Sequence, residues 1–437
     1  MASPWTEDDA PPSYEIEEDQ PLPIYSSNIS SSECLLRIEP PRMTNCPACD
    51  WMFETKHMQI NLGPRLWNLH SPSYGLNGRI EGAIRFSGDQ DRCESVTMTF
   101  EGRIRVTSSH RSSMSADTVM PLVTRTETIY DSTKAESFPW EGDHEFCLKI
   151  PREAEFRGQM TTLPPSHFSF HQHVSTEVFY TVKFDVKRKG KGLKKHESKI
   201  IRVLYLPKCT PLEPPLHTIP RPTSRLGGTS SELYYLYERV KTVMLTPYHP
   251  DDGKSKPKRS TSPLDDFGQC IFLSLPHPQC YASGQIIPFT LSLVFPDDPV
   301  LAALLTRNIR IQLLRRLNVW KKGSGDLIQR EELVALATLR YGREYKEGIT
   351  LLRGEIKAGD QGKEVSWSLD AVAEIQYVLR VILRPPTNLI GSVPCFKHEQ
   401  VIRLTTDSWG ILDRELSSMG GTPTPAIGLA ANIRRHE

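Results

Sequence analysis

The 437-residue sequence has almost no excess of charge of either sign. Its 53 lysines and arginines nearly cancel its 52 aspartates and glutamates, which leaves a formal net charge of +1. A chain of this kind presents no broad electric field toward nucleic acid or a charged membrane. We therefore expect no nucleic-acid partner, and we expect any electrostatic contact to come from local clusters of charge.

Long hydrophobic runs and a secretory signal are also missing. The apolar stretch PVLAALLT at 299–306 is far shorter than the roughly 20 residues that span a bilayer. The opening MASPWTEDDA is acidic and has neither the basic nor the apolar region of a signal peptide. The nine cysteines, an odd number scattered along the chain, fit reduced thiols better than a disulfide framework. These features predict an intracellular protein without disulfides.

The motifs that would mark a familiar enzyme are absent. The sequence has no GxxxxGK phosphate loop, no GxGxxG dinucleotide fingerprint, no GxSxG nucleophile elbow and no HExxH zinc motif. No nucleophile or base stands out as a catalytic residue. We therefore predict that the chain is not an enzyme and needs no cofactor.

Two small groups of metal-binding residue types need an interpretation. Cys46 and Cys49 form a CxxC pair, but a zinc ion needs four ligands and no second close pair follows. A thioredoxin-like role would need a βαβ setting, which this region lacks. His167, His171 and His173 lie beside a Leu-Pro-Pro-Ser turn, where an exposed loop is the simpler interpretation. We predict no metal site, and thiol or zinc chemistry at the two cysteines stays the less favoured alternative.

The first 50 residues are rich in acidic residues, proline and serine. Eight carboxylates precede the first basic residue, Arg37, and apolar side chains are few. Such a composition does not offset the entropy cost of ordering the chain, so we expect residues 1–50 to be disordered. Within them, Pro-Pro-Ser-Tyr at 11–14 and Leu-Pro-Ile-Tyr at 22–25 are candidate binding peptides.

From about Trp51 the sequence changes to short alternating runs separated by Gly, Pro and Asp. In VTMTFEGRIRV at 96–106 and EVFYTVKFDVK at 177–187, apolar residues recur with a period of two. A second series, which includes GQIIPFTLSLVF at 284–295 and EIQYVLRVIL at 374–383, has the same period. This period is typical of half-buried strands. Many short strands in blocks of about 150 residues predict two antiparallel sandwiches.

Proline-rich sequence separates the two blocks. The stretch KCTPLEPPLHTIPRPTSRLGG at 208–228 has too much proline for regular strands, and it is typical of a linker. Thr229 and Glu232 then form a capping box ahead of apolar residues spaced three or four apart, which predicts a short helix. Those apolar residues are Leu233, Leu236, Tyr237, Val240 and Met244.

These patterns divide the chain into five parts. We predict a disordered acidic leader at 1–50, a first β domain at 51–207, a proline-rich linker with the short helix at 208–265, a second β domain at 266–405 and a tail at 406–437. The predicted fold class is all-β, with two tandem antiparallel immunoglobulin-like β-sandwich domains and disordered termini.

The ordered series of motifs in the two blocks resembles the arrestin family, specifically the α-arrestins or arrestin-related trafficking adaptors. In the first block, FPWEGDHEFCLKIP, LPPSHFSF and STEVFYTVKFDVKRKG, which contains Tyr180, are similar to the arrestin N-domain. In the second block, FLSLPHPQCYASGQIIPFTLSLVF, LLRGEIKAG and EIQYVLRVIL are similar to the arrestin C-domain. The resemblance covers about residues 51 to 405 and implies an arrestin-like fold.

The resemblance also implies an intracellular adaptor. Paired sandwiches would contact a membrane transporter or receptor as cargo, and Pro-Pro-x-Tyr peptides would recruit a HECT-type ubiquitin ligase through its WW domains. The cargo would then be ubiquitinated, endocytosed and sorted, and the adaptor would lie in the cytoplasm, peripherally at the plasma membrane or endosomes. Family members usually carry these peptides after the C-domain, whereas here they precede the N-domain. The alternative is an arrestin-fold subunit of an endosomal sorting coat, similar to the retromer component, that recruits no ligase.

The two tetrapeptides suit WW domains on physical grounds alone. Consecutive prolines favour the polyproline II conformation, so little ordering entropy is lost when they dock in an aromatic-lined groove. Leu-Pro-Ile-Tyr is the weaker variant because leucine lacks the ring that fixes the first position, but two peptides on one tether add through effective concentration. The alternative is a leader in which proline and tyrosine occur together by chance. The predicted WW-binding residues are Pro11, Pro12, Tyr14, Leu22, Pro23 and Tyr25.

A basic stretch, KRKGKGLKKHESK at 187–199, separates two predicted strands that would pair as a hairpin. Such a loop could contact an anionic membrane surface or an acidic cargo tail, at about 1 kcal/mol for each basic residue near the surface. The equally favoured alternative is a solvated loop that prevents edge-to-edge aggregation. The residues predicted to make the contact are Arg188, Lys189, Lys191, Lys194 and Lys195.

Overall fold

The structure, a computed structural model, describes most of the chain from residue 49 onward. The described residues are 49–86, 93–110, 113–133, 143–170, 174–189, 196–219, 238–248, 270–320, 326–346, 349–389, 393–412, 414 and 424–433. Residues 1–48, which include both candidate binding peptides, lie outside them.

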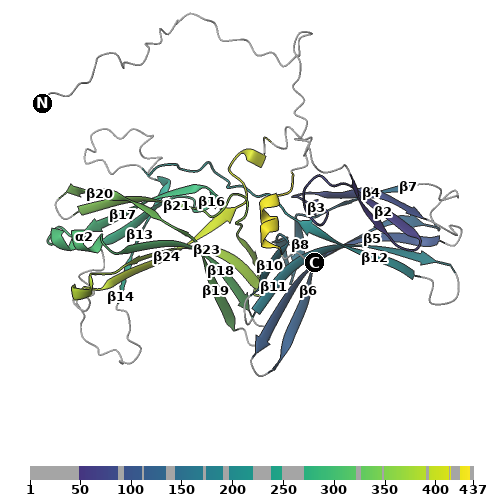
Figure 1. Cartoon of the computed structure of the whole chain (residues 1–437), viewed down its shortest axis with the longest axis horizontal. Coiled ribbons are helices and arrows are strands. Elements are labelled where there is room, and N and C mark those ends of the chain that lie inside the picture. Colours follow the sequence, from purple (N-terminus) through teal and green to yellow (C-terminus); the bar gives the residue numbers. More distant parts are fainter. Residues whose placement is uncertain are drawn as a thin grey trace, which may run out of the picture. The chain divides into compact units, whose positions relative to one another are not determined.

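The described strands up to residue 205 form two sheets and a hairpin (Figure 1). The smaller sheet has the strand order β1-β2-β4-β7, and the larger has the order β3-β12-β11-β5-β6, with β10 paired to β11. Strands β8 and β9 pair with each other. The bounds are β1 Asp50–Glu54, β2 Met58–Pro64, β3 Ser73–Tyr74, β4 Arg79–Phe86, β5 Cys93–His110, β6 Ser113–Asp131, β7 Asp143–Lys149, β8 Glu153–Phe156, β9 Gln159–Thr162, β10 His167–Phe170, β11 Val174–Arg188 and β12 His196–Tyr205.

The described strands from residue 240 onward form two further sheets. One has the order β13-β15-β17-β21-β20, and the other has the order β14-β24-β23-β18-β19, with β16 paired to β24 and β22 to β23. Their bounds are β13 Val240–Met244, β14 Thr246–Tyr248, β15 Ile271–Pro276, β16 Cys280–Ala282, β17 Ile286–Val294, β18 Ile309–Trp320, β19 Leu327–Leu336, β20 Thr338–Lys346, β21 Ile349–Lys357, β22 Trp367–Leu369, β23 Ala373–Leu383 and β24 Cys395–Thr405. The short helices whose bounds are described are α2 Pro299–Leu305, η4 Thr387–Leu389 and η5 Ile427–Asn432. No helix in the described ranges is long and apolar enough to cross a membrane.

Alternating side chains bury an apolar core between paired sheets. On β11 every second residue is at most 1% exposed: Val178, Tyr180, Val182, Phe184 and Val186. Phe146, from the smaller sheet, meets Phe184 edge to face with ring centroids 5.1 Å apart. Burying each such side chain contributes about 1.5–3 kcal/mol. The all-β sandwich fold predicted from the period of two is therefore confirmed.

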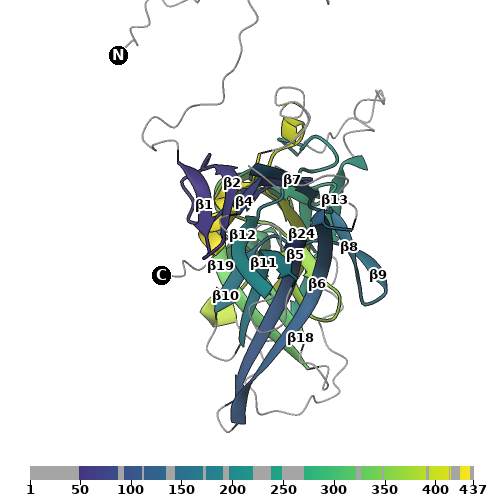
Figure 2. The same cartoon turned by 90° about the vertical axis from the view of Figure 1, so that its right-hand side faces the viewer.

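Strands β5 and β6 form the longest hairpin of the described chain, as Figure 2 shows. They pair antiparallel from Ser95↔Asp131 to His110↔Ser113, with irregular register at three points. Among the described strands β6 pairs only with β5, so it is an edge of this sheet. The predicted hairpin of β11 and β12 is also confirmed, with register from Tyr180↔Val203 to Lys187↔His196.

The predicted helix does not extend to Val240 and Met244: Glu238 is helical, but the chain then turns at Arg239. Val240–Met244 is the strand β13, which pairs antiparallel with β15 from Val240↔Pro276 to Met244↔Phe272. Backbone hydrogen bonds to a strand about 30 residues away override a local helical spacing of apolar residues, because intrinsic propensity is the weaker term. The capping box at 229–232 lies outside the described residues. Part of the predicted linker, at 240–248, therefore contributes β13 and β14 to the second group of sheets.

The end of the chain also differs from the expected disordered tail. Within the predicted tail at 406–437, Ala426 donates its backbone N–H to the carbonyl of Leu206 at 2.9 Å, and Leu429 of η5 is 1% exposed. Gly428 lies so close to Gly362 that an added Cβ would sit 2.6 Å from the Gly362 carbonyl carbon. Residues 424–433 are therefore a packed segment, because glycine at both positions permits direct contact of the two backbones.

Gly354 on β21 gives a test of the packing in the second group of sheets. It is paired with Phe289 of β17, and a Cβ at Gly354 would lie 2.2 Å from Phe289 Cζ. Phe289 is 1% exposed and has no room to move away. We expect Gly354→Ala to lower the free energy of unfolding by about 2 kcal/mol in urea titrations, because overpacking strains a filled core. The double variant with Phe289→Leu should recover part of this loss, and an unchanged stability of Gly354→Ala would contradict the packing.

Candidate functional site

The residues predicted from the sequence as binding sites fall largely outside the described chain. All six predicted WW-binding residues do so, and so do Lys191, Lys194 and Lys195 of the basic loop. Lys189 is exposed. Arg188 instead donates from Nη2 to Glu197 Oε2 at 3.1 Å, across the hairpin. Contact of the loop with an anionic surface stays a prediction. In such a contact the Arg188 side chain would already be paired with Glu197.

The metal and thiol candidates are not brought together. Cys49 is exposed, and Cys46 lies outside the described residues. Within the part of the chain that the structure describes, no three His, Cys, Asp or Glu side chains gather closely enough to hold a metal ion. The expectation of an exposed loop is wrong for His167, which begins β10 opposite Val178 and is 6% exposed. His171 and His173 lie outside the described residues.

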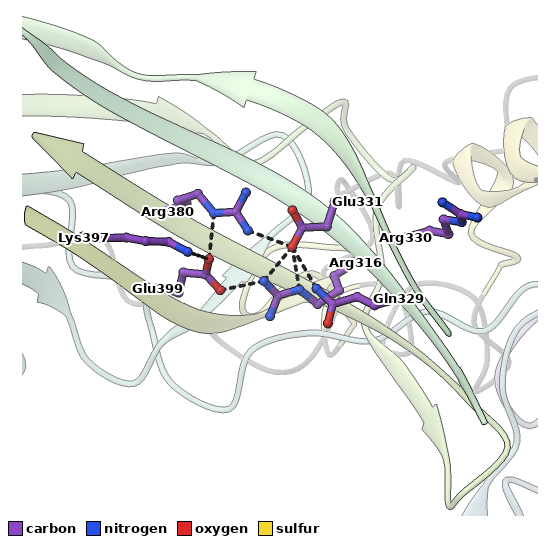
Figure 3. Close-up of a pocket in the computed structure, with 7 residues that line it drawn as sticks. All are labelled: Arg316, Gln329, Arg330, Glu331, Arg380, Lys397 and Glu399. Atoms are coloured by element: carbon purple, nitrogen blue, oxygen red, sulfur yellow. Dashed lines mark hydrogen bonds and ion pairs between the residues drawn. The ribbon is translucent and has the colours of Figure 1, made fainter. Parts of the chain in front are cut away.

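An ion-pair network on the β19-β18-β23-β24 sheet is the candidate functional site (Figure 3). Arg316 donates to Glu331 at 2.7 Å and to Glu399 at 2.6 Å. Arg380 donates to the same two carboxylates, each at 2.8 Å. Lys397 adds a third cation, 2.8 Å from Glu399. Each carboxylate therefore joins two arginines that lie on different strands.

The network keeps its carboxylates ionised. Burial alone would raise the pKa of Glu399, but hydrogen bonds from Lys397 and Arg316 and the charge of Arg380 lower it to about 2. The pKa of Glu331 is also lowered, because bonds from Arg316 and Arg380 outweigh the effect of burial. Three cations face two carboxylates, which leaves one positive charge in excess. In Figure 3 the side chain of Arg330 lies apart from these bonds.

Beneath the network, four apolar side chains form a row across four neighbouring strands. Leu333 of β19 pairs with Leu314 of β18, Leu314 pairs with Val378 of β23, and Val378 pairs with Val401 of β24. Directly paired residues of antiparallel strands point to the same face of a sheet. We call these four residues the apolar row. It lies on the face of the sheet opposite to the buried core residues Ile375, Tyr377 and Leu379.

The ion pairs explain why the middle of the apolar row is buried. Arg316 and Glu331 are paired on one side of the row, and Arg380 and Glu399 are paired on the other. The bonds from Arg316 to Glu399 and from Arg380 to Glu331 must therefore cross it. We call these four charged residues the ionic cover.

Exposure along the row follows the position of the ionic cover. Leu314 is 5% exposed and Val378 is 0% exposed beneath it. Leu333 and Val401, at the two ends, are 48% and 47% exposed. An open depression of about 670 Å³ lies over the network. The face thus combines exposed apolar ends, a covered apolar centre and charged groups, which is the mixture found at protein interfaces.

The larger sheet of the first group carries a related arrangement. Glu177 of β11 is buried and bonds to both Arg105 and Arg202. The guanidinium carbons of these arginines lie 5.2 and 5.6 Å from the ring centroid of Phe179. Here one carboxylate holds two arginines against an aromatic ring, which adds a cation–π contact to the ion pairs. The sheet face is thereby fixed in shape and mostly polar.

A second buried polar cluster lies where residues of the two groups of sheets meet. Tyr377 donates its hydroxyl to Glu364 Oε2 at 2.6 Å, and Arg315 Nη1 lies 3.7 Å from the same oxygen. Burial beside Glu364 raises the pKa of Tyr377 well above its ordinary value. The rings of His167 and Trp367 meet edge to face, 5.7 Å apart. The space between His167, Arg315, Trp367 and Tyr377 is nearly filled, with only about 10 Å³ free, so these side chains pack the junction between the two groups of sheets.

The sequence did contain a signal for the ionic cover. The inner-face positions of EIQYVLRVIL were predicted correctly, since Ile375, Tyr377 and Leu379 are at most 3% exposed. The intervening positions, Val378 and Arg380, belong to the outer face by the same alternation. The signal in the sequence was therefore an apolar residue, Val378, next to an arginine, Arg380, on the outer face of the same strand. Its partners on β18, β19 and β24 could not be assigned without the register.

In comparison with known proteins, no family model and no curated protein matches the chain.

Proposed function

We propose that the chain is an intracellular adaptor and not an enzyme, and that it recruits a HECT-type ubiquitin ligase through WW domains to a membrane transporter or receptor. Ubiquitination of that cargo would promote its endocytosis and sorting. The observation that carries the proposal is the Pro-Pro-Ser-Tyr peptide at 11–14 ahead of two series of sandwich strands whose motifs resemble the arrestins. The adaptor would act in the cytoplasm, peripherally at the plasma membrane or endosomes.

The sheet surfaces give the proposal physical support. A sandwich holds its outer faces rigid, so side chains on them are positioned before a partner arrives and little entropy is lost on binding. The apolar row ends in two half-exposed side chains and is flanked by charged groups. Charge patterns of this kind select partners more than they add affinity. A surface that recognises protein and a separate peptide that recruits an enzyme are the two parts an adaptor needs.

The test is binding of the full chain to immobilised tandem WW domains. We expect Tyr14→Ala to weaken binding at least tenfold, because a buried aromatic anchor dominates a peptide contact. Tyr25→Ala should have a smaller effect, since Leu22 replaces the first proline of that peptide. The double variant should abolish binding, and Ser13→Ala, which keeps Pro-Pro-x-Tyr, should leave it unchanged. Undiminished binding by the double variant would overturn the proposal. So would co-purification of a stoichiometric partner, with no ligase present, that persists after residues 1–50 are deleted.

A further inference from the structure

We propose that the β19-β18-β23-β24 face binds an extended acidic segment of a partner protein, with two apolar side chains four residues apart and a carboxylate midway between them. The inference deepens the proposed function, because it assigns the adaptor's partner-binding surface and the chemistry of the segment that it recognises. The apolar side chains would contact Leu333 and Val401, and the carboxylate would meet Arg316 and Arg380.

The spacing comes from the geometry of the sheet. Leu333 and Val401 lie on β19 and β24, which are separated by three strand-to-strand spacings. Neighbouring strands are about 4.8 Å apart, so the two ends of the apolar row are about 14 Å apart. An extended peptide advances about 3.3 Å per residue, which places residues i and i+4 about 13 Å apart on the same side as residue i+2. A peptide laid across the strands therefore matches both exposed ends of the row and places one side chain over its centre.

The charge at the centre selects a carboxylate. Arg316 and Arg380 use only Nε and Nη2 in the ionic cover, and their Nη1 groups make no hydrogen bond to any residue that the structure describes. The network carries one positive charge in excess, and Arg403 lies exposed two residues beyond Val401 on the same face. An incoming carboxylate gains charge-assisted hydrogen bonds from groups that are already held in place. A third carboxylate balances the three cations of the network.

The apolar ends favour a peptide over a purely anionic ligand. Leu333 and Val401 offer half-exposed aliphatic surface that an inositol phosphate or a lipid headgroup would leave in water. The ionic cover also fixes the centre, since both arginines are less than a quarter exposed. A peptide that supplies aliphatic groups at both ends and one carboxylate between them uses the whole face. The other anions are outcomes of the test.

The test uses the full chain and the synthetic peptide acetyl-Ser-Leu-Ser-Glu-Ser-Leu-Ser-amide, with binding measured by calorimetry at low ionic strength. We expect saturable binding at one site. A peptide of the same composition with adjacent leucines should bind about tenfold more weakly, because only one leucine then reaches an end of the row. Replacing the glutamate by glutamine should also weaken binding about tenfold, since the charge-assisted bonds are lost.

Variants of the protein locate the site. Arg380→Gln and Leu333→Thr should each weaken binding about tenfold, and Arg380→Gln should no longer distinguish the glutamate peptide from the glutamine peptide. Arg340→Gln is the matched control, because Arg340 pairs with Glu355 at 3.1 Å on the other sheet of the second group. Thermal unfolding of each variant checks the fold, and Leu333→Thr tests the site even if Arg380→Gln is unstable.

Several outcomes overturn the inference. One is equal affinity for the peptides with separated and with adjacent leucines. Another is that Arg380→Gln and the change from glutamate to glutamine in the peptide weaken binding additively. Binding of inositol hexakisphosphate or anionic vesicles in place of the peptide, with the same dependence on Arg380, would assign the face to a different ligand. Binding to WW domains is measured on the same samples. If the wild-type chain binds the peptide but not the WW domains, the proposed function is contradicted. If it binds the WW domains but not the peptide, only this inference is contradicted.

Discussion

Acidification from about pH 7.5 to about pH 4.5 is expected to lower the free energy of unfolding by about 3 kcal/mol through His167 alone. Burial of this histidine, and to a lesser extent the charge of Arg315, lowers its pKa from 6.5 to about 3. The neighbours facing the ring include Trp367, Tyr377 and Asn432. Because none of them is an acid that could hold an imidazolium, the folded protein keeps His167 neutral.

The sign of the effect follows from proton binding. Between about pH 6.5 and pH 3 the unfolded chain binds a proton at His167 that the folded chain does not bind. Stability is therefore complete above about pH 6.5 and is lost as the pH falls toward about 3. In the middle of this range, where unfolding takes up nearly one proton, the free energy of unfolding falls by about 1.4 kcal/mol for each pH unit.

The measurement is urea unfolding of the wild type and of His167→Leu at a series of pH values. The variant cannot take up the proton, so its stability should fall by about 3 kcal/mol less over the same range. His196→Gln, which removes an exposed histidine from the start of β12, is the control and should keep the wild-type profile. Parallel profiles for the wild type and His167→Leu would show that His167 does not stay neutral in the folded state.

Glu364→Ala is expected to lower the free energy of unfolding by about 3–5 kcal/mol, because it leaves Arg315 and Tyr377 without their buried partner. Glu364 is 5% exposed and accepts the Tyr377 hydroxyl at 2.6 Å. Its backbone N–H also bonds to Ser283 Oγ at 3.0 Å, so the backbone at Glu364 is fixed as well as the side chain. A cavity and an unsatisfied Tyr377 hydroxyl would replace these contacts, and Arg315 would lose its ion pair with Glu364.

A matched substitution separates the charge of Glu364 from its hydrogen bond. Glu364→Gln keeps an acceptor for Tyr377 and removes the charge near Arg315, which retains its bond to Glu332. We expect this variant to lose only about 1 kcal/mol. Thermal and urea unfolding measure both variants at neutral pH. If the two variants lost equal stability, the charge of Glu364 and not its hydrogen bond would carry the effect. If neither variant lost stability, the cluster would not stabilise the junction.

The strands were predictable from the sequence because their signal is local. Tyr180 and Tyr377 sit in runs whose period of two assigns one face to the core, and both side chains are at most 1% exposed. The helix prediction was wrong at Val240 and Met244 because the signal that decides their structure is not local. A spacing of three or four is also local, but the hydrogen bonds of β13 go to β15, which no local pattern identifies.

The candidate site was predictable only in part. The sequence indicates that Arg380 and Val378 share an outer face, because the inner face of β23 is clear. It does not indicate that Arg380 reaches Glu331 or that Arg316 reaches Glu399, since these bonds join residues 49 and 83 positions apart. The packed segment at 424–433 was missed because its contacts depend on backbone proximity of Gly428 to Gly362 and not on an apolar period.

The sequence by itself determined the all-β sandwich fold, the inner faces of the long strands and the presence of two proline–tyrosine peptides, because alternation and proline content act over a few residues. Only the tertiary structure decided which charged side chains meet across β19, β18, β23 and β24, and that they cover Leu314 and Val378. It also decided that His167 is buried beside Trp367. The physical reason is register: a shift of one residue in any of these strands would turn the side chains of that strand to the opposite face.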